Sequence, residues 1–300
     1  MSMLYDSFGP SRQTQSAAQK SQTVATPIGH QFSPYDSNGG SILAIAGPDF
    51  CVVAGDTRQS TGYSIQTRYK PKVFRLNDVA TLATNGFSAD AEALVDKVKQ
   101  RLVFYRHNHG THMSLNAIAR MISTMLYGKR FFPYYVYNIL GGVDEEGKGA
   151  VYSFDPVGSY ERETCRAAGA AQSLLQPFLD NQIMYKNQQP TPGRPIPAPG
   201  TYDVATVLRI TMDSFTSATE RHIEVGDGLE MFIVRTAPAA AAAEGSGEGE
   251  ATAAAAAPGD GVKTSSLDLK ALFGAVEAYG GEEEQTAGAT MVVRKELKKD

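Results

Sequence analysis

Hydrophobic residues recur along this chain with two periods, one typical of β-strands and one typical of amphipathic helices. The first clear signal is a pair of apolar runs at 41–46 and 50–54, separated by Gly47-Pro48-Asp49. Glycine and proline set turn dihedrals, and the flanking β-branched residues suit a pleated surface, so these runs predict a β-hairpin. Further strands are expected at 63–74, 79–85, 131–137, 139–143, 149–154, 160–168, 229–234 and 291–297.

Apolar residues at three- and four-residue spacing predict helices between these strands. The expected helices are 89–106, 115–126, 170–183 (with Pro177 as a kink or break), 204–221 and a short one at 266–279. Ser88, Ser114 and Asp203 are candidate N-caps, and Gly128 is a candidate left-handed stop. Strands, two helices, strands, two helices and strands follow in order. This order predicts an α+β fold with two antiparallel sheets between two helix layers, a four-layer αββα sandwich.

Two segments lack this periodicity. Residues 1–37 predict a flexible leader without the apolar core of a signal peptide, so the folded domain is expected at 38–300. Residues 236–289 form an alanine-, glycine- and glutamate-rich insertion, which buries too little apolar surface to offset its chain entropy. The strands at 229–234 and 291–297 are expected to pair across it.

Composition narrows the classes of function. A net charge of −4 gives no reason to expect nucleic-acid or membrane binding, and no run of eighteen apolar residues suggests a membrane span. The two cysteines, Cys51 and Cys165, do not form a disulfide framework, and Cys51 is expected in the core. Such cysteine usage fits a reducing compartment, so the cytoplasm or nucleus is expected.

Two segments contain residue types found in ligand sites, but neither has the pattern of one. His107, His109 and His112 could bind a metal, but no nearby cysteine or carboxylate completes a tetrahedral set, so a solvated loop is favoured. The stretch from Asn38 to Ser41 is rich in glycine, but it lacks the spacing and the following helix of a phosphate-binding loop. No metal and no cofactor are therefore expected.

Several long stretches carry a family resemblance. They are NGG at 38–40, AGDTR at 54–58, YGKRFFPYY at 127–135, YSFDPVGSYE at 152–161 and DSFTSATER at 213–221. Over about 31–234 and the last strand, the chain resembles the β-type subunits of the 20S proteasome. Within that family it is most similar to the non-catalytic class at the sixth position of the β ring.

The resemblance implies the fold of an N-terminal-nucleophile hydrolase and a place in a particle that degrades ubiquitin-tagged proteins to peptides. It implies β-subunit partners in the same and the opposite seven-membered ring, α-ring subunits, and assembly chaperones. Contacts between subunits are expected at the aromatic run 131–137 and at the final strand.

The resemblance also assigns the catalytic positions of the family. Active relatives use a chain-terminal threonine whose own amine accepts the proton, because an α-amine has a pKa near 7.7–8.0. The aspartate and lysine positions fall on Asp56 and Lys72, but the threonine position falls on Gly40. The two supporting positions fall on His222 and Val225. No catalytic residue is therefore expected, and Asp56 and Lys72 are left as a pair, either buried and structural or solvated.

Two other functions remain open from the sequence. Cleavage after Gly40 would expose an N-terminal Ser41, making the chain an amidase, but strand alternation turns Ser41 away from Lys72. Alternatively, the insertion and the 266–279 helix could make the chain an adaptor for an assembly factor, which is compatible with a structural subunit.

Overall fold

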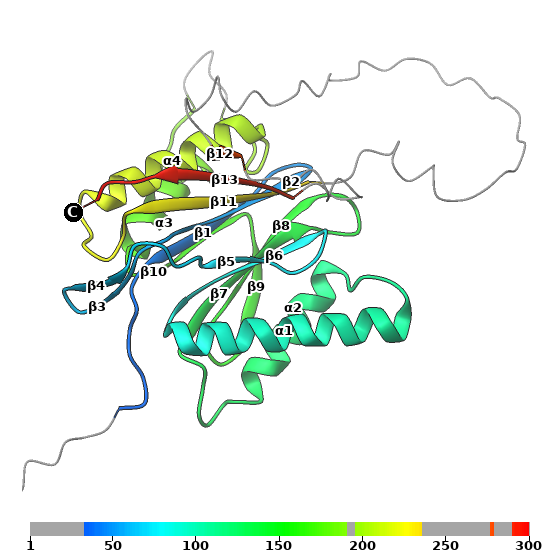
Figure 1. Ribbon diagram of the computed structural model, residues 1–300. Helices are drawn as coiled ribbons and strands as arrows, with labels where there is room; N and C mark the ends of the chain where they lie inside the picture. Colours follow the sequence, from blue (N-terminus) through cyan, green and yellow to red (C-terminus); the bar gives the residue numbers. More distant parts are fainter. Residues whose placement is uncertain (1–32, 191–195, 236–276, 279–289, 300) are drawn as a thin grey trace, which may run out of the picture. The chain divides into compact units, whose positions relative to one another are not determined.

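The computed structural model describes residues 33–190, 196–235, 277–278 and 290–299 (Figure 1). Its main compact unit begins at Tyr35. The strands are β1 Ser41–Ala46, β2 Phe50–Asp56, β3 Gln59–Thr61, β4 Ser64–Thr67, β5 Val73–Arg75, β6 Ala80–Gly86, β7 Val136–Val143, β8 Gly149–Phe154, β9 Tyr160–Glu163, β10 Cys165–Gly169, β11 Gly228–Arg235, β12 Glu277–Ala278 and β13 Thr290–Glu296. The helices are α1 Ser88–His109, α2 Leu115–Tyr127, α3 Gln172–Gln182 and α4 Val204–Thr219.

The strands form two larger antiparallel sheets and one short hairpin. The six-stranded sheet has the order β10-β1-β2-β11-β13-β12, and the five-stranded sheet has the order β5-β6-β7-β8-β9. The hairpin expected at the first turn is confirmed, since β1 and β2 pair with Ile42 opposite Gly55. The expected pairing across the insertion is also confirmed, because Val234 of β11 lies opposite Thr290 of β13.

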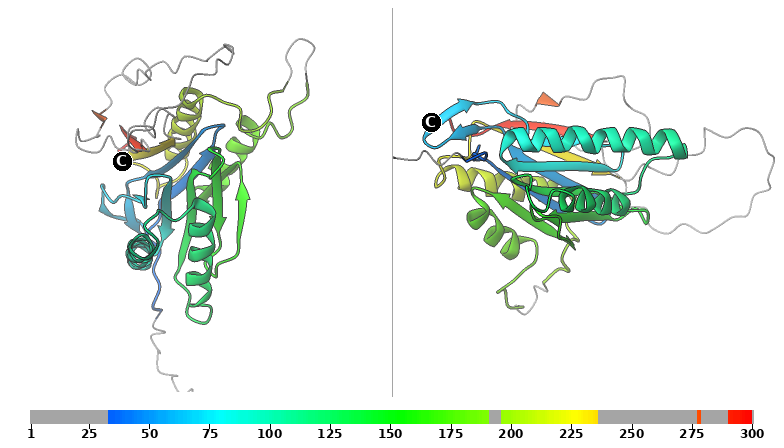
Figure 2. Two further views of the ribbon diagram at one scale, coloured as in Figure 1. Left: turned by 90° about the vertical axis from the view of Figure 1, so that its right-hand side faces the viewer. Right: turned by 90° about the horizontal axis from the view of Figure 1, so that it is seen from below.

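Three clusters of buried side chains separate four layers. One cluster joins helices α3 and α4 to the six-stranded sheet, and a second joins α1 and α2 to the five-stranded sheet. The third lies between the sheets and includes Ile42, Val53 and Ile139. Figure 2 shows the same order of layers from two further sides. The expected αββα arrangement is therefore present in the described residues.

Three strand predictions were wrong. The expected strand at 63–74 is two strands, β4 in the short hairpin and β5 at the edge of the five-stranded sheet, with an irregular segment between them. Residues 131–135 form an exposed connection between α2 and β7, in which the Phe131 side chain is 97% exposed. The expected strand at 160–168 bends at Thr164, so that β9 ends the five-stranded sheet and β10 begins the six-stranded one. A change of sheet leaves the period-two pattern unbroken, which explains why the bend is not visible in the sequence.

Two helix ends and one position inside a helix also differ from the sequence-based expectation. Helix α1 extends through His107 and His109, which end it rather than lying in a loop, and His109 stacks on Tyr105 at 4.2 Å. Gly128 is right-handed helical, with φ −60°, and not a left-handed stop. Pro177 lies inside a continuous α3.

Two predictions concern residues that are mostly outside this description. The helix expected at 266–279 lies outside the described residues except at Glu277–Ala278, which pair with β13 as a strand. The leader expected at 1–37 lies outside them up to residue 32.

Candidate functional site

Gly40 stands at the start of β1, at the position where the resemblance places a nucleophile. Its φ is +75°, a left-handed conformation that side chains rarely adopt. A β-carbon built on Gly40 would lie 2.2 Å from Lys72 Cε and 2.6 Å from Lys72 Nζ. Lys72 therefore fills the space that a nucleophilic side chain would need.

The ammonium group of Lys72 is held by three oxygen atoms. Its Nζ donates to the backbone carbonyls of Arg58 at 2.6 Å and Asp56 at 2.9 Å, and it lies 3.2 Å from Asp56 Oδ1. A lysine ammonium has three donors, so these contacts account for all of them. The sequence left open whether Asp56 and Lys72 form a structural pair, and the structure shows that they do.

Both members of this pair are buried: the Asp56 side chain is 0% exposed and the Lys72 side chain 8%. Burial raises the pKa of Asp56 and lowers the pKa of Lys72, because desolvation penalises both charged forms. Their mutual attraction acts against each shift. The backbone N–H of Ser41 also donates to Asp56 Oδ1, at 2.7 Å.

Ser41, the alternative nucleophile, has a fixed place of its own. Its Oγ accepts a hydrogen bond from the backbone N–H of Ala171 at 2.8 Å. Ala171 is the N-cap residue of α3, where backbone N–H groups lack partners inside the helix. The hydroxyl is fully buried, so it ties β1 to α3.

The resemblance places His222 and Val225 at the two positions that support the amine in active relatives. His222 Nδ1 accepts a hydrogen bond from the backbone N–H of Glu224 at 3.3 Å, and the Val225 side chain is buried in the apolar core. Glu224 fills the space beside Gly39, because a β-carbon there would lie 2.9 Å from Glu224 Cβ. The segment thus packs against Gly39.

The structure adds a buried charged cluster that sequence reasoning missed. Arg58 Nε donates to Asp227 Oδ2 at 2.7 Å, and the exposed Arg68 binds the other carboxylate oxygen. Arg58 and Asp227 are 1% and 2% exposed at the side chain. Burial alone would raise the pKa of Asp227, but hydrogen bonds from both arginines outweigh it and hold that pKa below its ordinary value.

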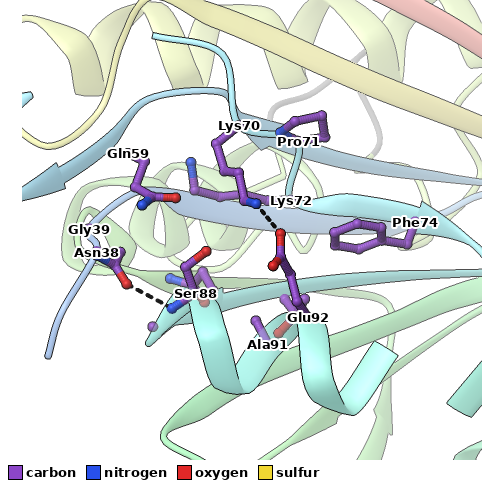
Figure 3. A pocket seen from close by; sticks show the side chains of 13 residues that line it. Asn38, Gly39, Gln59, Lys70, Pro71, Lys72, Phe74, Ser88, Ala91 and Glu92 are labelled. Atoms are coloured by element: carbon purple, nitrogen blue, oxygen red, sulfur yellow. Dashed lines mark hydrogen bonds and ion pairs between the residues drawn. The ribbon is translucent and has the colours of Figure 1, made fainter. Parts of the chain in front are cut away.

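The residues in front of Gly40 are part of the fold. Asn38 Oδ1 accepts a hydrogen bond from the backbone N–H of Ser88 at 2.8 Å, so Asn38 caps α1 from outside the helix (Figure 3). Phe87 is the N-cap residue and makes no side-chain cap bond. Ser88, a candidate N-cap, is instead the first residue of α1. Ser114 is the N-cap residue of α2, as expected, but its hydroxyl makes no capping hydrogen bond to the helix backbone.

A small cavity lies between this segment and α1. It measures about 20 Å³, and Lys70 and Glu92 form an ion pair at its rim (Figure 3). That volume matches a single water molecule and not the side chain of a peptide.

The histidine triplet does not come together as a metal site. His107 and His109 belong to the last turn of α1, while His112 lies 3.7 Å from Asp78. Over the described part of the chain, no group of three metal-binding side chains was found, and no helix there is long and apolar enough to cross a membrane.

Comparisons with known proteins agree with the sequence motifs. The family model described as Proteasome subunit matches residues 36–190. Proteasome subunit beta type-6 of Saccharomyces cerevisiae is 58% identical over 217 residues, covering 71% of this chain and 90% of the relative. Proteasome subunit beta type-1 of Danio rerio is 51% identical over 208 residues, covering 69% and 85%.

A plant relative extends the comparison. Proteasome subunit beta type-1 of Arabidopsis thaliana is 43% identical over 239 residues, covering 80% of this chain and 96% of the relative. The resemblance to the β type-1 class is thereby supported over most of the length of each relative. This chain belongs to the proteasome subunit family and is one of its β-type members.

Proposed function

We propose that this β-type subunit builds the wall of the 20S proteasome chamber and performs no peptide-bond hydrolysis itself. The observation that carries the proposal is the position of Lys72 Cε, 2.2 Å from where a β-carbon of residue 40 would stand. A nucleophile, its amine and the lysine must lie side by side for the reaction, and a misplacement of about 1 Å can cost about a hundredfold in rate. Here the nucleophile is missing and its space is taken.

The supporting positions strengthen this proposal. Val225 offers no hydrogen-bonding atom from its side chain, and His222 replaces the family's carboxylate. Three of the five catalytic roles are thus unfilled. The remaining two, Asp56 and Lys72, act as a structural ion pair.

The amidase alternative through Ser41 has less support. Its Oγ accepts from Ala171 at 2.8 Å on the side of α3, and its backbone N–H is engaged by Asp56 Oδ1. A catalytic Ser41 would need a free amine and a hydroxyl beside Lys72, so both interactions would have to be broken.

The proposed fold, ring position and partners of this subunit follow from its membership of the family. The fold is that of the N-terminal-nucleophile hydrolases, and the subunit takes the sixth position of a seven-membered β ring. Its partners are β subunits of the same and the opposite ring, α-ring subunits and assembly chaperones, without nucleic acid or membrane. The particle works in the cytoplasm and nucleus, and this subunit uses no cofactor.

Exposed aromatic side chains mark one contact surface in this proposal. Phe131 is 97% exposed and Phe132 62% exposed, and Tyr35 packs against Phe132 with ring centroids 5.6 Å apart. Apolar side chains of this size are costly to leave in water, and aromatic residues are enriched at protein interfaces. The final strand β13 is the second surface, because it lies near the edge of its sheet.

We also retain the domain organisation expected from the sequence: a leader at 1–37, a folded domain at 38–300, and an insertion at 236–289. In this proposal the leader is trimmed by another subunit, since Gly40 cannot cleave the chain itself.

Native mass spectrometry of the purified particle, with N-terminal mapping of this chain, tests the proposal. We expect one or more copies of the chain in the particle and no label on it from an electrophile that reacts with N-terminal nucleophiles. A mature N-terminal serine at residue 41 that carries the label would overturn the non-catalytic assignment, and a particle without the chain would overturn the structural one.

A further inference from the structure

A long stretch of the chain carries no negative charge. From Lys97 to Val143 there is no aspartate or glutamate, although the whole chain has a net charge of −4. The same stretch contains seven cations: Lys97, Lys99, Arg101, Arg106, Arg120, Lys129 and Arg130. Positive charge is therefore concentrated in one region of an acidic protein.

The fold gathers this stretch on one face of the five-stranded sheet. Helices α1 and α2 lie there, on the side away from the other sheet (Figures 1 and 2). A groove of about 670 Å³ runs between them and the following loop. Three cations line it, Lys97, Arg101 and Lys129, together with the apolar side chains Phe104, Met121 and Met125.

These cations have no acidic partner within the part of the chain that the structure describes. No carboxylate there forms an ion pair with Lys97, Arg101 or Lys129. Asp96 precedes Lys97 in α1, but adjacent helix residues do not face each other. Lys97 Nζ instead donates to the Tyr134 hydroxyl at 2.7 Å, which holds its charge at the groove.

The apolar part of the groove is open to solvent. Phe104 is 65% exposed, and Val103 beside it is 67% exposed. Two methionines form the opposite wall, and their flexible thioether side chains adapt to an inserted group. An apolar floor flanked by unpaired cations fits an apolar side chain with carboxylates on either side.

We propose that the groove between α1 and α2 binds an acidic segment of a neighbouring protein subunit, with one apolar side chain inserted at Phe104, Met121 and Met125. The inference rests on the proposed function, because the partner is a subunit of the same particle. The complementary charge speeds association and rejects basic segments, while the apolar contact supplies affinity. Nucleic acid fits less well, since its phosphates would leave the methionine wall uncovered.

The first test places a photo-crosslinking amino acid at Phe104 in the assembled particle. Native mass spectrometry establishes that the chain has been incorporated, so a failure of the proposed function is seen separately from a failure of the groove. We expect crosslinks to one subunit peptide that carries at least two carboxylates near an apolar residue. Crosslinks to a peptide without carboxylates, crosslinks to nucleic acid, or no crosslinks in a particle containing the chain would overturn the inference.

The second test reverses charge at the groove. Arg101→Glu with Lys129→Glu should reduce the crosslink from position 104 about tenfold or more, because like charges then face each other. Arg101→Lys with Lys129→Arg retains the charge and should retain the crosslink. Lys148→Glu, in an exposed turn outside the groove, is the matched control.

If the reversed chain does not assemble, Arg101→Gln removes one charge at lower cost. It should weaken the crosslink by a smaller factor, and reversing the acidic residues of the identified partner should restore binding to the Arg101→Glu chain. An unchanged crosslink in either variant would contradict the role of charge in the groove.

Discussion

Lys72 reaches into the space above Gly40, and its Cε lies 2.2 Å from the place where a β-carbon on residue 40 would stand. The same lysine lies 3.2 Å from Asp56 Oδ1. The Asp56–Lys72 pair therefore occupies the space beside Gly40, where the resemblance places the nucleophile. Glycine at 40 is required both by this contact and by its positive φ.

Substituting Gly40 by alanine should destabilise the chain by more than backbone strain alone. Gly62→Ala is the matched control, because Gly62 also has a positive φ, +59°, but no atom lies within 4 Å of its β-carbon position. We expect about 1 kcal/mol for Gly62→Ala, from strain, and about 3 kcal/mol or more for Gly40→Ala, which must also displace Lys72. Urea unfolding of the purified chains measures both, and equal losses would contradict the steric role of Lys72.

Installing the nucleophile should not restore catalysis. In Gly40→Thr the new side chain meets Lys72 and Asp56, and the supporting residues at 222 and 225 are still absent. We expect no labelling by an electrophile that reacts with N-terminal threonines, measured by intact-mass analysis of the particle. Labelling of Gly40→Thr would mean that Lys72 and Asp56 move to make room for the new side chain. The remaining residues of the site would then still support catalysis.

The Asp56–Lys72 pair should behave as a buried structural pair. Asp56→Asn leaves the Lys72 ammonium without its counter-charge, so we expect a loss of about 3 kcal/mol in the free energy of unfolding. The exposed pair of Lys148 and Glu146 is the control, since Glu146→Gln should change stability by about 0.5 kcal/mol or less. A small effect of Asp56→Asn would contradict the structural role of this buried pair.

Stability at acid pH should depend on Asp227. Its folded pKa is lowered by Arg58 and Arg68, while an unfolded aspartate titrates near about 3.9. The stabilisation is therefore present above about pH 4 and is lost as the pH falls through the lower folded pKa. Asp227→Asn should lower the free energy of unfolding at pH 7 and should make that free energy fall less as the pH is lowered. Denaturant unfolding at several pH values measures both effects.

The Asn variant keeps the backbone requirement at position 227. Asp227 has φ +65°, and asparagine tolerates this conformation, so the comparison isolates charge from strain. Glu220→Gln, which alters an exposed ion pair with Lys298, should leave the loss of stability at acid pH unchanged. If Asp227→Asn loses as much stability on acidification as the unmodified chain, the two arginines do not lower the pKa of this carboxylate.

Asn38 should act as a remote helix cap. Asn38→Ala removes the acceptor for the Ser88 N–H and should cost about 1 kcal/mol, with faster hydrogen exchange in the first turn of α1. Asn38→Asp keeps that acceptor, so exchange at Ser88 should stay slow. Equal exchange in both variants would mean that the cap does not hold the helix.

Most of the layers could be predicted from the sequence because their strands and helices depend on the local spacing of apolar residues. The β1–β2 hairpin, the amphipathic helices and the β11–β13 pairing across the insertion all follow from alternating or helical apolar positions. The strand prediction for the aromatic residues 131–135 was wrong for a physical reason. A strand-like apolar pattern indicates that side chains are stabilised by burial, but it does not indicate whether the surface that covers them belongs to the same chain.

The candidate site was predicted at Gly40, Asp56 and Lys72, since the family spacing fixes those positions. The Arg58–Asp227 pair was not found, because 169 residues separate its members and no local pattern links them. The sequence does carry one signal: Arg58 lies two residues after the end of the buried strand β2, in a polar cluster. The capping role of Asn38 was missed for the same reason, since Ser88 lies 50 residues further along the chain.

Strands β11 and β13 pair with Val234 opposite Thr290, so the chain leaves the sheet and returns to it at neighbouring points. When the two ends of a connection are already adjacent, each doubling of its length costs only about 0.6 kcal/mol. The junction is consequently a convenient place to graft an affinity handle or a fluorescent module, which would allow the particle to be purified or followed without rebuilding its folded layers.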